Sequence, residues 1–234
     1  IKGSATQRRR FLDMEISQIN PRYLVALQQY RQVLKQRNSL LKHHRPDVGM
    51  LEVWDAQLVP AGEVLMRERA TFVAALSAEA TIAYEQIATQ EVMTVTYAPD
   101  VSVEADFAAV LAESRDTDLR RRQSTRGPHR DDMGIHIAGK SARIYGSQGQ
   151  QKSAALALKL AEIALIHEQT GEFPILMLDE VLAELDAHRA EHLFEMLADK
   201  VQCLVTTTER ELTEKIGGRP YRRFQMTRGQ IEAQ

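Results

Sequence analysis

The sequence predicts an α/β protein with a mainly helical arm. Residues 1–122 contain long segments whose apolar residues recur at helical spacing, which is typical of amphipathic helices. From Gly127 onward, short strand-like segments alternate with helical ones, as in an α/β domain. The apolar run at residues 174–179 has the pattern of a parallel-sheet strand buried on both faces. We therefore expect a helical arm domain over residues 1–122 and an α/β domain over residues 123–234.

Helix signals divide the arm. Pro21 follows Asn20 and predicts a helix over residues 21–41, which ends before the break at residues 45–47. A second helical pattern covers residues 51–84, and Pro60 predicts a kink or break inside it. Alternating residues then predict a short strand over 91–97, before a last helix over 105–122.

The elements expected after Gly127 are shorter. They are a β-hairpin with strands near residues 133–137 and 142–145, a loop at 146–151, a helix over 152–167, the strand at 174–179, a helix over 187–200, a strand at 203–207 and a terminal hairpin over 221–233 that turns near Arg228.

The first hairpin contains a P-loop pattern. Residues 134–141 fit G-x-x-x-x-G-K-[ST] at every position. A P-loop follows a buried strand and opens a helix, whereas here Gly139 and Lys140 are expected to form the turn between two strands. Because no helix is expected to begin at Ser141, we predict a β-hairpin and no phosphate-binding loop at this place.

The composition is that of an ordinary globular protein. Charged residues make up 26% of the chain and hydrophobic residues 44%, and no apolar run approaches the length of a membrane span. The single cysteine excludes a disulfide within the chain, and no signal-peptide pattern opens it, so we expect a cytoplasmic protein. With a net charge of −2, any nucleic-acid surface has to be local.

Such a local surface is present as an arginine cluster. It comprises Arg120, Arg121, Arg122, Arg126 and Arg130, and Arg8–Arg10 form a second, smaller group. Charge runs are commonly just solvated faces, but guanidinium groups favour bidentate phosphate contacts. Since no aromatic residues are interleaved, the cluster predicts DNA binding through the backbone and independent of base sequence.

Two further segments carry anion and metal chemistry. Asp179 and Glu180 end the predicted strand, where one carboxylate can orient hydrated Mg²⁺ and the next can polarise a water molecule. A buried strand that simply ends in charged residues is the alternative. Ser147 and two glycines precede a helix, and such a loop offers backbone N–H groups, a hydroxyl and the positive end of the helix dipole to an anion.

The order of these features resembles the C-terminal half of an ABC-type P-loop NTPase head, in which a signature loop is followed by the Walker B strand and the D-loop. Five motifs narrow the resemblance to the RecF family of bacterial recombination mediators, which are related to Rad50 and SMC heads. They are residues 8–13, residues 35–38, Gly-Pro-His-Arg-Asp-Asp at 127–132, the loop at 147–151 and the threonines at 206–208. The resemblance covers most of the chain.

The resemblance implies a set of roles. It makes Asp179 the Mg²⁺ residue and Glu180 the catalytic base for ATP hydrolysis. The residues that it implies for ATP binding are Ser147, Gln148, Gly149, Gln150, Asp179, Asp186 and Thr207, with the signature loop serving the nucleotide of a second subunit. It further implies that the chain is a C-terminal fragment without the Walker A half, so we expect no ATPase activity from the chain alone.

For the complete protein, the resemblance implies an ATP-dependent homodimer with weak DNA-dependent ATPase activity. It would bind gapped or junction DNA and, with RecR and RecO, promote RecA loading in DNA repair, replication and the SOS response. Two alternatives remain open: an SMC- or Rad50-type head whose arm extends into a coiled coil, and an interaction module without turnover.

Overall fold

The computed structural model describes residues 1–88, 91–179, 190, 193–195, 197, 201–208 and 220–233. The chain forms two compact units, residues 1–172 and 173–234, which are treated separately below. A sheet in the first unit joins strands from both sides of position 122. The functional division predicted at residue 122 stays a prediction.

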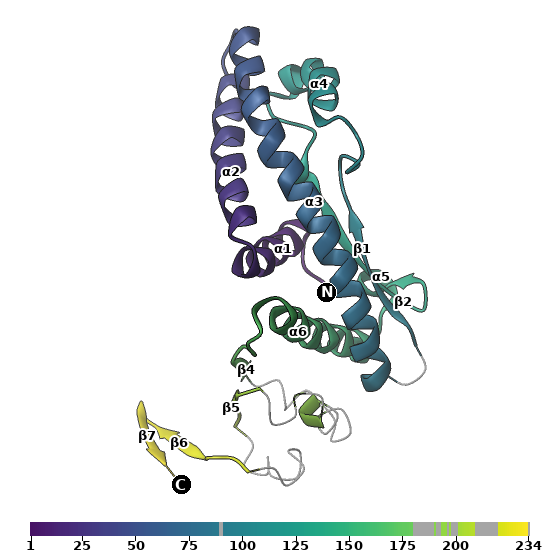
Figure 1. Ribbon diagram of the computed structural model, residues 1–234, viewed down its shortest axis with the longest axis vertical. Helices are drawn as coiled ribbons and strands as arrows, with labels where there is room; N and C mark the ends of the chain where they lie inside the picture. The colour runs from purple at the N-terminus through teal and green to yellow at the C-terminus, as the bar shows by residue number, and fades with distance from the viewer. Residues whose placement is uncertain are drawn as a thin grey trace. The chain divides into compact units, whose positions relative to one another are not determined.

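Four helices make up most of residues 1–122 in the first unit (Figure 1). They are α1 (Ala5–Ile19), α2 (Pro21–Leu41), α3 (Val48–Ile87) and α4 (Phe107–Arg121). Helices α2 and α3 run side by side as an antiparallel hairpin, with α4 beside the end where α2 joins α3, and α1 at the other end. The helical character predicted for the arm is confirmed in these elements.

Side-chain caps explain where the helices begin. Ser4 and Gln7 form a capping box at the start of α1, each side chain bonding the other residue's backbone N–H. Asn20 ends α1 and also caps α2, where Pro21 occupies the first helical position. Asp47 caps α3 by accepting a hydrogen bond from the backbone of Met50 at 3.2 Å.

A kink or break was predicted at Pro60; the break was wrong, because α3 runs through this position without interruption, and the kink stays a prediction. Pro60 cannot donate a hydrogen bond to the carbonyl of Ala56, one turn earlier. Both residues lie on the exposed side of the helix, where water can solvate that carbonyl, and the opposite side of α3 is buried against its neighbours. Packing thus outweighs the local helix-breaking tendency.

The sheet of the first unit is antiparallel in the order β1-β2-β3, with β1 at Met93–Ala98, β2 at Asp132–Ile137 and β3 at Lys140–Ser141. Ala138 and Gly139 have φ angles of 48° and 73°, which suit a tight two-residue hairpin turn. The predicted hairpin is confirmed. The turn is at Ala138 and Gly139, one residue earlier than predicted. The second strand is Lys140–Ser141, and the strand predicted over residues 142–145 was wrong, because Ala142–Tyr145 form one helical turn, α5. Three of these four residues are exposed, so no buried face holds them in a strand.

Helix α6 (Gln148–Thr170) completes the first unit and confirms the predicted helix after the loop. It packs against α3 and α1. Its buried side is mostly alanine and leucine, with a few polar residues such as Glu162, and Gly171 ends it in the left-handed conformation.

In the residues of the second unit that the structure describes, there are two pairs of strands. Strand β4 (Leu176–Asp179) pairs in parallel with β5 (Cys203–Thr206), and β6 (Phe224–Thr227) forms an antiparallel hairpin with β7 (Gln230–Ala233), as predicted. The prediction that β4 is buried on both faces was wrong, because Ile175 and Met177 are 60% and 75% exposed. In the part of this sheet that the structure describes, nothing covers one face. The helix predicted over residues 187–200 falls mostly outside the described residues.

A buried arginine, Arg69, ties the elements of the first unit together. Only 2% exposed, it extends from α3 and bonds Asp13 on α1 and Asp131, each at 2.8 Å. It also donates to Tyr23 on α2 and to the carbonyl of Pro128. Asp131 is fully buried and further accepts from Tyr97 and from the backbone of Asp100. One guanidinium group therefore connects three helices and the segment that leads into β2.

A second buried arginine, Arg37, holds the other end of the arm. It is fully buried on α2 and bonds Asp55 of α3 at 2.6 Å and Asp118 of α4 at 2.7 Å. Neighbouring Asn38 accepts a hydrogen bond from the backbone of Ser124. Arg8 forms a third link, a two-bond contact with Asp132 at 2.6 and 2.7 Å. Residues from three of the five motifs that carry the family resemblance (8–13, 35–38 and 127–132) make these contacts, so these motifs have a structural role.

Two glycines allow Phe107 and Tyr30 to fit between α3 and the Pro128–Arg130 turn, η1. A Cβ atom at Gly62 would lie 2.5 Å from the Phe107 ring, and one at Gly127 would lie 2.7 Å from the Tyr30 hydroxyl. Gly127 also has a φ of 126°, which side chains rarely permit. The glycine of the Gly-Pro-His-Arg-Asp-Asp motif is therefore required by the backbone and by packing.

We expect Asp131→Ala to destabilise the chain by about 3–5 kcal/mol, because it leaves the buried Arg69 charge partly uncompensated. Urea unfolding measures the change. The matched control is Glu52→Ala, which breaks the exposed pair with Arg115 and should change stability by no more than about 1 kcal/mol. Equal effects of the two substitutions would contradict the role given to Arg69.

Candidate nucleotide and nucleic-acid sites

The predicted signature loop forms the start of α6. Ser147 is the N-cap residue, and its hydroxyl accepts from the backbone of Gln150 at 3.1 Å. The Gln150 side chain in turn accepts from the backbone of Ser147 at 2.8 Å, which completes a capping box. A second contact holds Gln150 to the first unit's sheet region, since its amide donates to Glu91 at 2.7 and 2.9 Å.

Gln151 holds the segment that leads into this loop. Its buried amide donates to the carbonyls of Ala142 and Gly146 at 2.9 and 3.0 Å. A Cβ atom at Gly146 would lie 2.5 Å from the carbonyl oxygen of Ala142, so only glycine permits this close turn. The short helix α5 is thereby held against the start of α6, and the loop has a fixed shape.

The start of α6 can bind an anion in three ways. Within the described structure, the backbone N–H groups of Gln148 and Gly149 make no hydrogen bond, as expected for the first turn of a helix. The Ser147 hydroxyl accepts a bond and keeps its own proton to donate. Ser147 and Gln148 are exposed. Three donors and the positive end of a 23-residue helix thus face outward, whereas the side chain of Gln150 is engaged within the protein.

The second unit places Asp179 at the C-terminal end of β4. There it lies opposite Thr206 of β5, whose hydroxyl donates to one of its carboxylate oxygens. The carboxylate is exposed, and its other oxygen has no bond within the described structure. That oxygen fits a contact to a hydrated Mg²⁺ ion. Half-buried Thr207 follows β5 directly. Glu180 and Asp186 lie outside the described residues.

The predicted DNA-binding arginines do not form one continuous surface of equal exposure. Arg120, Arg121 and Arg122 are exposed at the end of α4, where Arg122 has a left-handed φ of 55°. Arg126 is half-buried and paired with Asp100 at 3.1 Å. Arg121 and Arg126 line a shallow hollow of about 410 Å³ with hydroxyls from Ser114, Thr117 and Thr125. Arg130 lies apart from this hollow, at the end of η1.

Curated relatives with known names are similar to most of this chain. A protein named DNA replication and repair protein RecF from Shouchella clausii is 41% identical over 222 residues, which are 89% of this chain and 60% of that protein. The RecF of Alkaliphilus oremlandii is 40% identical over 99% of the chain and 66% of its own length. The chain belongs to the RecF family. It spans about 60% of the length of the curated relatives that it matches.

Solved structures agree with this assignment. A structure described as the recombination mediator protein RecF-ATP in the RecFOR pathway matches the entire chain with a TM-score of 0.87 and 29% identity. The chain covers 64% of that structure. An SMC head domain from Pyrococcus furiosus matches with a TM-score of 0.52 at 14% identity, which is a likeness of fold alone. No protein-family model matches the chain.

The part of the chain that the structure describes contains neither a cluster of three metal-ligating side chains nor a helix long and apolar enough to cross a membrane. Sequence reasoning did not single out Arg69 or the carboxylates around Arg37. The only sign of these residues in the sequence was a charged residue inside an otherwise apolar helix face. Such a sign does not show which residue the charged group pairs with.

Helix α6 carries a buried carboxyl group that responds to pH. Burial raises the pKa of Glu162 to about 7, although Lys159 donates a bond to it at 2.6 Å, and the neighbouring Glu15 also has a raised pKa because of burial. One oxygen of Glu162 is buried without a partner in the described structure. The charged form of this group is therefore unfavourable between α6 and α1.

We expect Glu162→Gln to stabilise the chain at pH 8 by about 2–3 kcal/mol and to have little effect at pH 5. A carboxyl whose folded pKa is raised contributes stability below its unfolded value, and that contribution is lost as pH rises toward 7. Thermal unfolding of both proteins at the two pH values measures this. Glu168→Gln, on the exposed end of the same helix, is the control and should show no such pH dependence. Equal shifts at both pH values would contradict the assignment.

The false P-loop gives a further prediction. Gly134–Ile137 belong to β2 and pair with β1, so their backbone groups cannot surround a phosphate, and Lys140 is exposed on β3. A short helix does begin after Ser141, contrary to the sequence argument, but it is one turn long. We expect Lys140→Ala to leave the calorimetric titration of this chain with Mg-ATP unchanged. A micromolar affinity that disappears with Lys140 would contradict the hairpin interpretation.

Proposed function

We propose that this chain is part of an ATP-dependent, DNA-binding recombination mediator that forms a dimer when ATP is bound. The observation that carries the proposal is the start of α6, where a hydroxyl and two backbone N–H groups face outward on a rigid, capped helix. A signature loop that serves the nucleotide of a second subunit needs this outward geometry. The RecF-ATP structure matches all of this chain, and this match supports the nucleotide assignment.

The sheet of the second unit supports the view that the functional head contains more than the described strands. Ile175, Met177 and Leu204 are exposed at 60%, 75% and 50%. An apolar sheet face of this kind is normally covered. In the proposal, the part of RecF that the chain does not span covers it and supplies the Walker A loop.

We assign roles to the chain's own residues from the family resemblance and, for Asp179 and Ser147, also from their positions. Asp179 offers one carboxylate oxygen to the water shell of Mg²⁺, while Thr206 orients the other oxygen. Glu180 would position the attacking water, Asp186 would couple the two sites, and Thr207 would sense the phosphate state. The metal ion, when bound, would neutralise charge that develops on the phosphate oxygens. Ser147, Gln148 and Gly149 would bind the terminal phosphate of the other subunit's ATP.

Gln150 has a supporting part in this arrangement. Its side chain holds the Ser147 backbone and Glu91, so we assign it to the shape of the loop in addition to any contact with nucleotide. The exposed arginines at the end of α4 would contact phosphates of gapped or junction DNA. RecR and RecO are the proposed partners, with RecA loading as the outcome, because the solved relatives belong to the RecFOR pathway.

The SMC-like likeness makes a structural ATPase head a second candidate. In such a head the arm would continue as a long coiled coil. Here six residues join α2 to α3, and α4 packs near that end, so the arm closes within the described structure. This observation favours the RecF-type function.

We expect Ser147→Arg, in the full-length protein that contains this chain, to abolish ATP-induced dimerisation and to leave nucleotide binding by the monomer unchanged. The larger side chain would block close approach of a second subunit at the outward-facing loop. Light scattering with ATP and titration with a fluorescent nucleotide measure the two properties separately. Ser147→Thr, which retains a capping hydroxyl, is the control and should still dimerise. Loss of monomer binding in Ser147→Arg would show that the loop serves its own subunit's nucleotide.

A further inference from the structure

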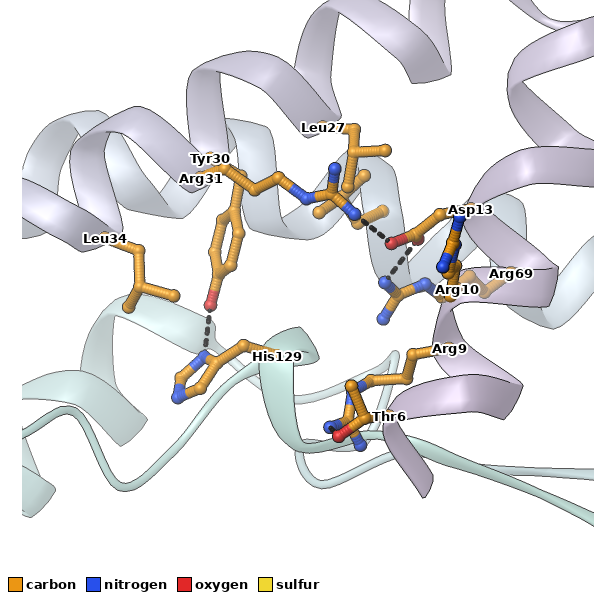
Figure 2. Close-up of a pocket in the computed structure, with 11 residues that line it drawn as sticks. Thr6, Arg9, Arg10, Asp13, Leu27, Tyr30, Arg31, Leu34, Arg69 and His129 are labelled. Carbon is orange, nitrogen blue, oxygen red and sulfur yellow. Dashed lines mark hydrogen bonds and ion pairs between the residues drawn. The ribbon is translucent and has the colours of Figure 1, made fainter. Parts of the chain in front are cut away.

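A second cavity, remote in sequence from the α6 loop, lies at the base of the helical hairpin in the first unit. It has a volume of about 380 Å³ and is lined by α1, α2, α3 and η1. Figure 2 shows Arg10 and Arg31 on one side of the open space, and Arg9 and His129 on the other. The volume falls in the range of small-molecule sites.

Positive charge exceeds negative charge around this cavity. Four guanidinium groups line it, and Asp13 is the only carboxylate in the lining. Asp13 is shared by Arg31 and Arg69, and Arg69 also uses buried Asp131 behind the wall. Two carboxylates therefore compensate the charge of two of the four guanidinium groups, which leaves an excess of two positive charges.

The excess resides on Arg9 and Arg10. Arg9 is held in place by hydrogen bonds to the carbonyl of Asp131 at 2.7 Å and to the Thr6 hydroxyl at 3.1 Å, neither of which carries a formal charge. Arg10 is exposed, and its guanidinium group makes no hydrogen bond or ion pair with any described residue. Each guanidinium group has five N–H donors, so both keep donors for a ligand. Two uncompensated guanidinium groups, of which Arg9 is held in place by its hydrogen bonds, suit a phosphate group.

The rest of the lining is neutral and largely apolar. Leu27, Leu34 and Leu65 form a wall beside Tyr30. His129 bonds the Tyr30 hydroxyl at 2.8 Å and the carbonyl of Ser124 at 3.2 Å, and burial lowers the pKa of His129, so it adds no charge. A bare phosphate would leave most of the cavity empty. A ligand with a phosphate at one end and a planar, weakly polar body at the other matches both sides.

We propose that this cavity binds the phosphate and base of a single nucleotide unit. Arg9, Arg10 and Arg31 contact the phosphate, and the leucine wall with Tyr30 contacts the base or sugar. The unit is either a free nucleotide or the terminal nucleotide of a DNA strand, and the two sources share this chemistry. The site is distinct from the exposed arginines of α4 and from the start of α6, and it does not depend on the function proposed for them.

Isothermal titration of the chain with deoxyadenosine monophosphate tests the site. We expect saturable binding that Arg10→Ala weakens by roughly tenfold, which corresponds to about 1.4 kcal/mol. Arg31→Ala should weaken binding as well. The matched control is Arg22→Ala, which removes the same charge from an exposed position on the same helix as Arg31 and should change binding less than twofold. Because Arg10 has no partner in the described structure, its removal should leave thermal unfolding unchanged.

Three further ligands separate the chemistry and the source. Deoxyribose 5-phosphate should bind more weakly than the nucleotide, because it lacks the base and so makes fewer contacts with the leucine wall. A short single-stranded oligonucleotide with a 5′-phosphate should displace a fluorescent nucleotide if a strand end is the natural ligand, and its 5′-hydroxyl form should then compete less well. If neither oligonucleotide competes while the mononucleotide still binds, the site takes a free nucleotide.

Two results would overturn the proposal. One is the absence of saturable binding of deoxyadenosine monophosphate at millimolar concentration. The other is an equal loss of binding in Arg22→Ala and Arg10→Ala, which would reduce the effect to overall charge. Neither result bears on ATP-induced dimerisation through Ser147, so failure here and failure of the proposed function are distinguishable.

Discussion

The guanidinium group of Arg69 is the contact on which the first unit depends. It is nearly inaccessible to water, and it bonds acidic or polar groups on α1 and α2 and in the segment leading into β2. A buried charge of this kind is tolerated only when its partners are in place, so Arg69 specifies one arrangement of these elements and penalises others. Arg37 acts in the same way among α2, α3 and α4. The hairpin is therefore held near both ends by charge pairs and between them by apolar packing.

This frame has consequences for the candidate sites. Helix α6 packs on α3 and α1, and this packing fixes the position of the exposed start of α6 within the first unit. The capping box at Ser147 and Gln150 and the two bonds of Gln151 fix the local shape. A loop held in this way can present donors without reorganising when an anion arrives, which lowers the cost of binding. Rigidity at this loop is consistent with a role at an interface between two subunits.

The same frame leaves a charge imbalance at the base of the hairpin. Asp13 and Asp131 satisfy Arg69 and, through Asp13, Arg31, while Arg9 and Arg10 receive no carboxylate. An imbalance of this kind in a cavity with an apolar wall is the physical basis for the nucleotide site that we propose. It also separates two kinds of arginine in this chain. Those that are buried and paired with carboxylates, such as Arg69, hold the fold, and those without a carboxylate partner, such as Arg9 and Arg10, remain able to bind ligands.

The sequence by itself determined the helical character of the arm, the helices that correspond to α2, α3, α4 and α6, the two hairpins, the parallel pairing expected of β4 and the family, because caps, periodicity and short motifs act locally or are specific to RecF. It also predicted that Ser147 and the residues after it precede a helix and offer donors to an anion. Only the tertiary structure decided what the motif residues do. Arg8, Arg37 and Asp131 were recognisable as a family pattern, but their ion-pair partners are 18 to 124 positions away along the chain, a separation that no local pattern encodes. For the same reason Pro60 did not break α3 and residues 142–145 did not form a strand, since packing and exposure set by distant segments outweigh local preference.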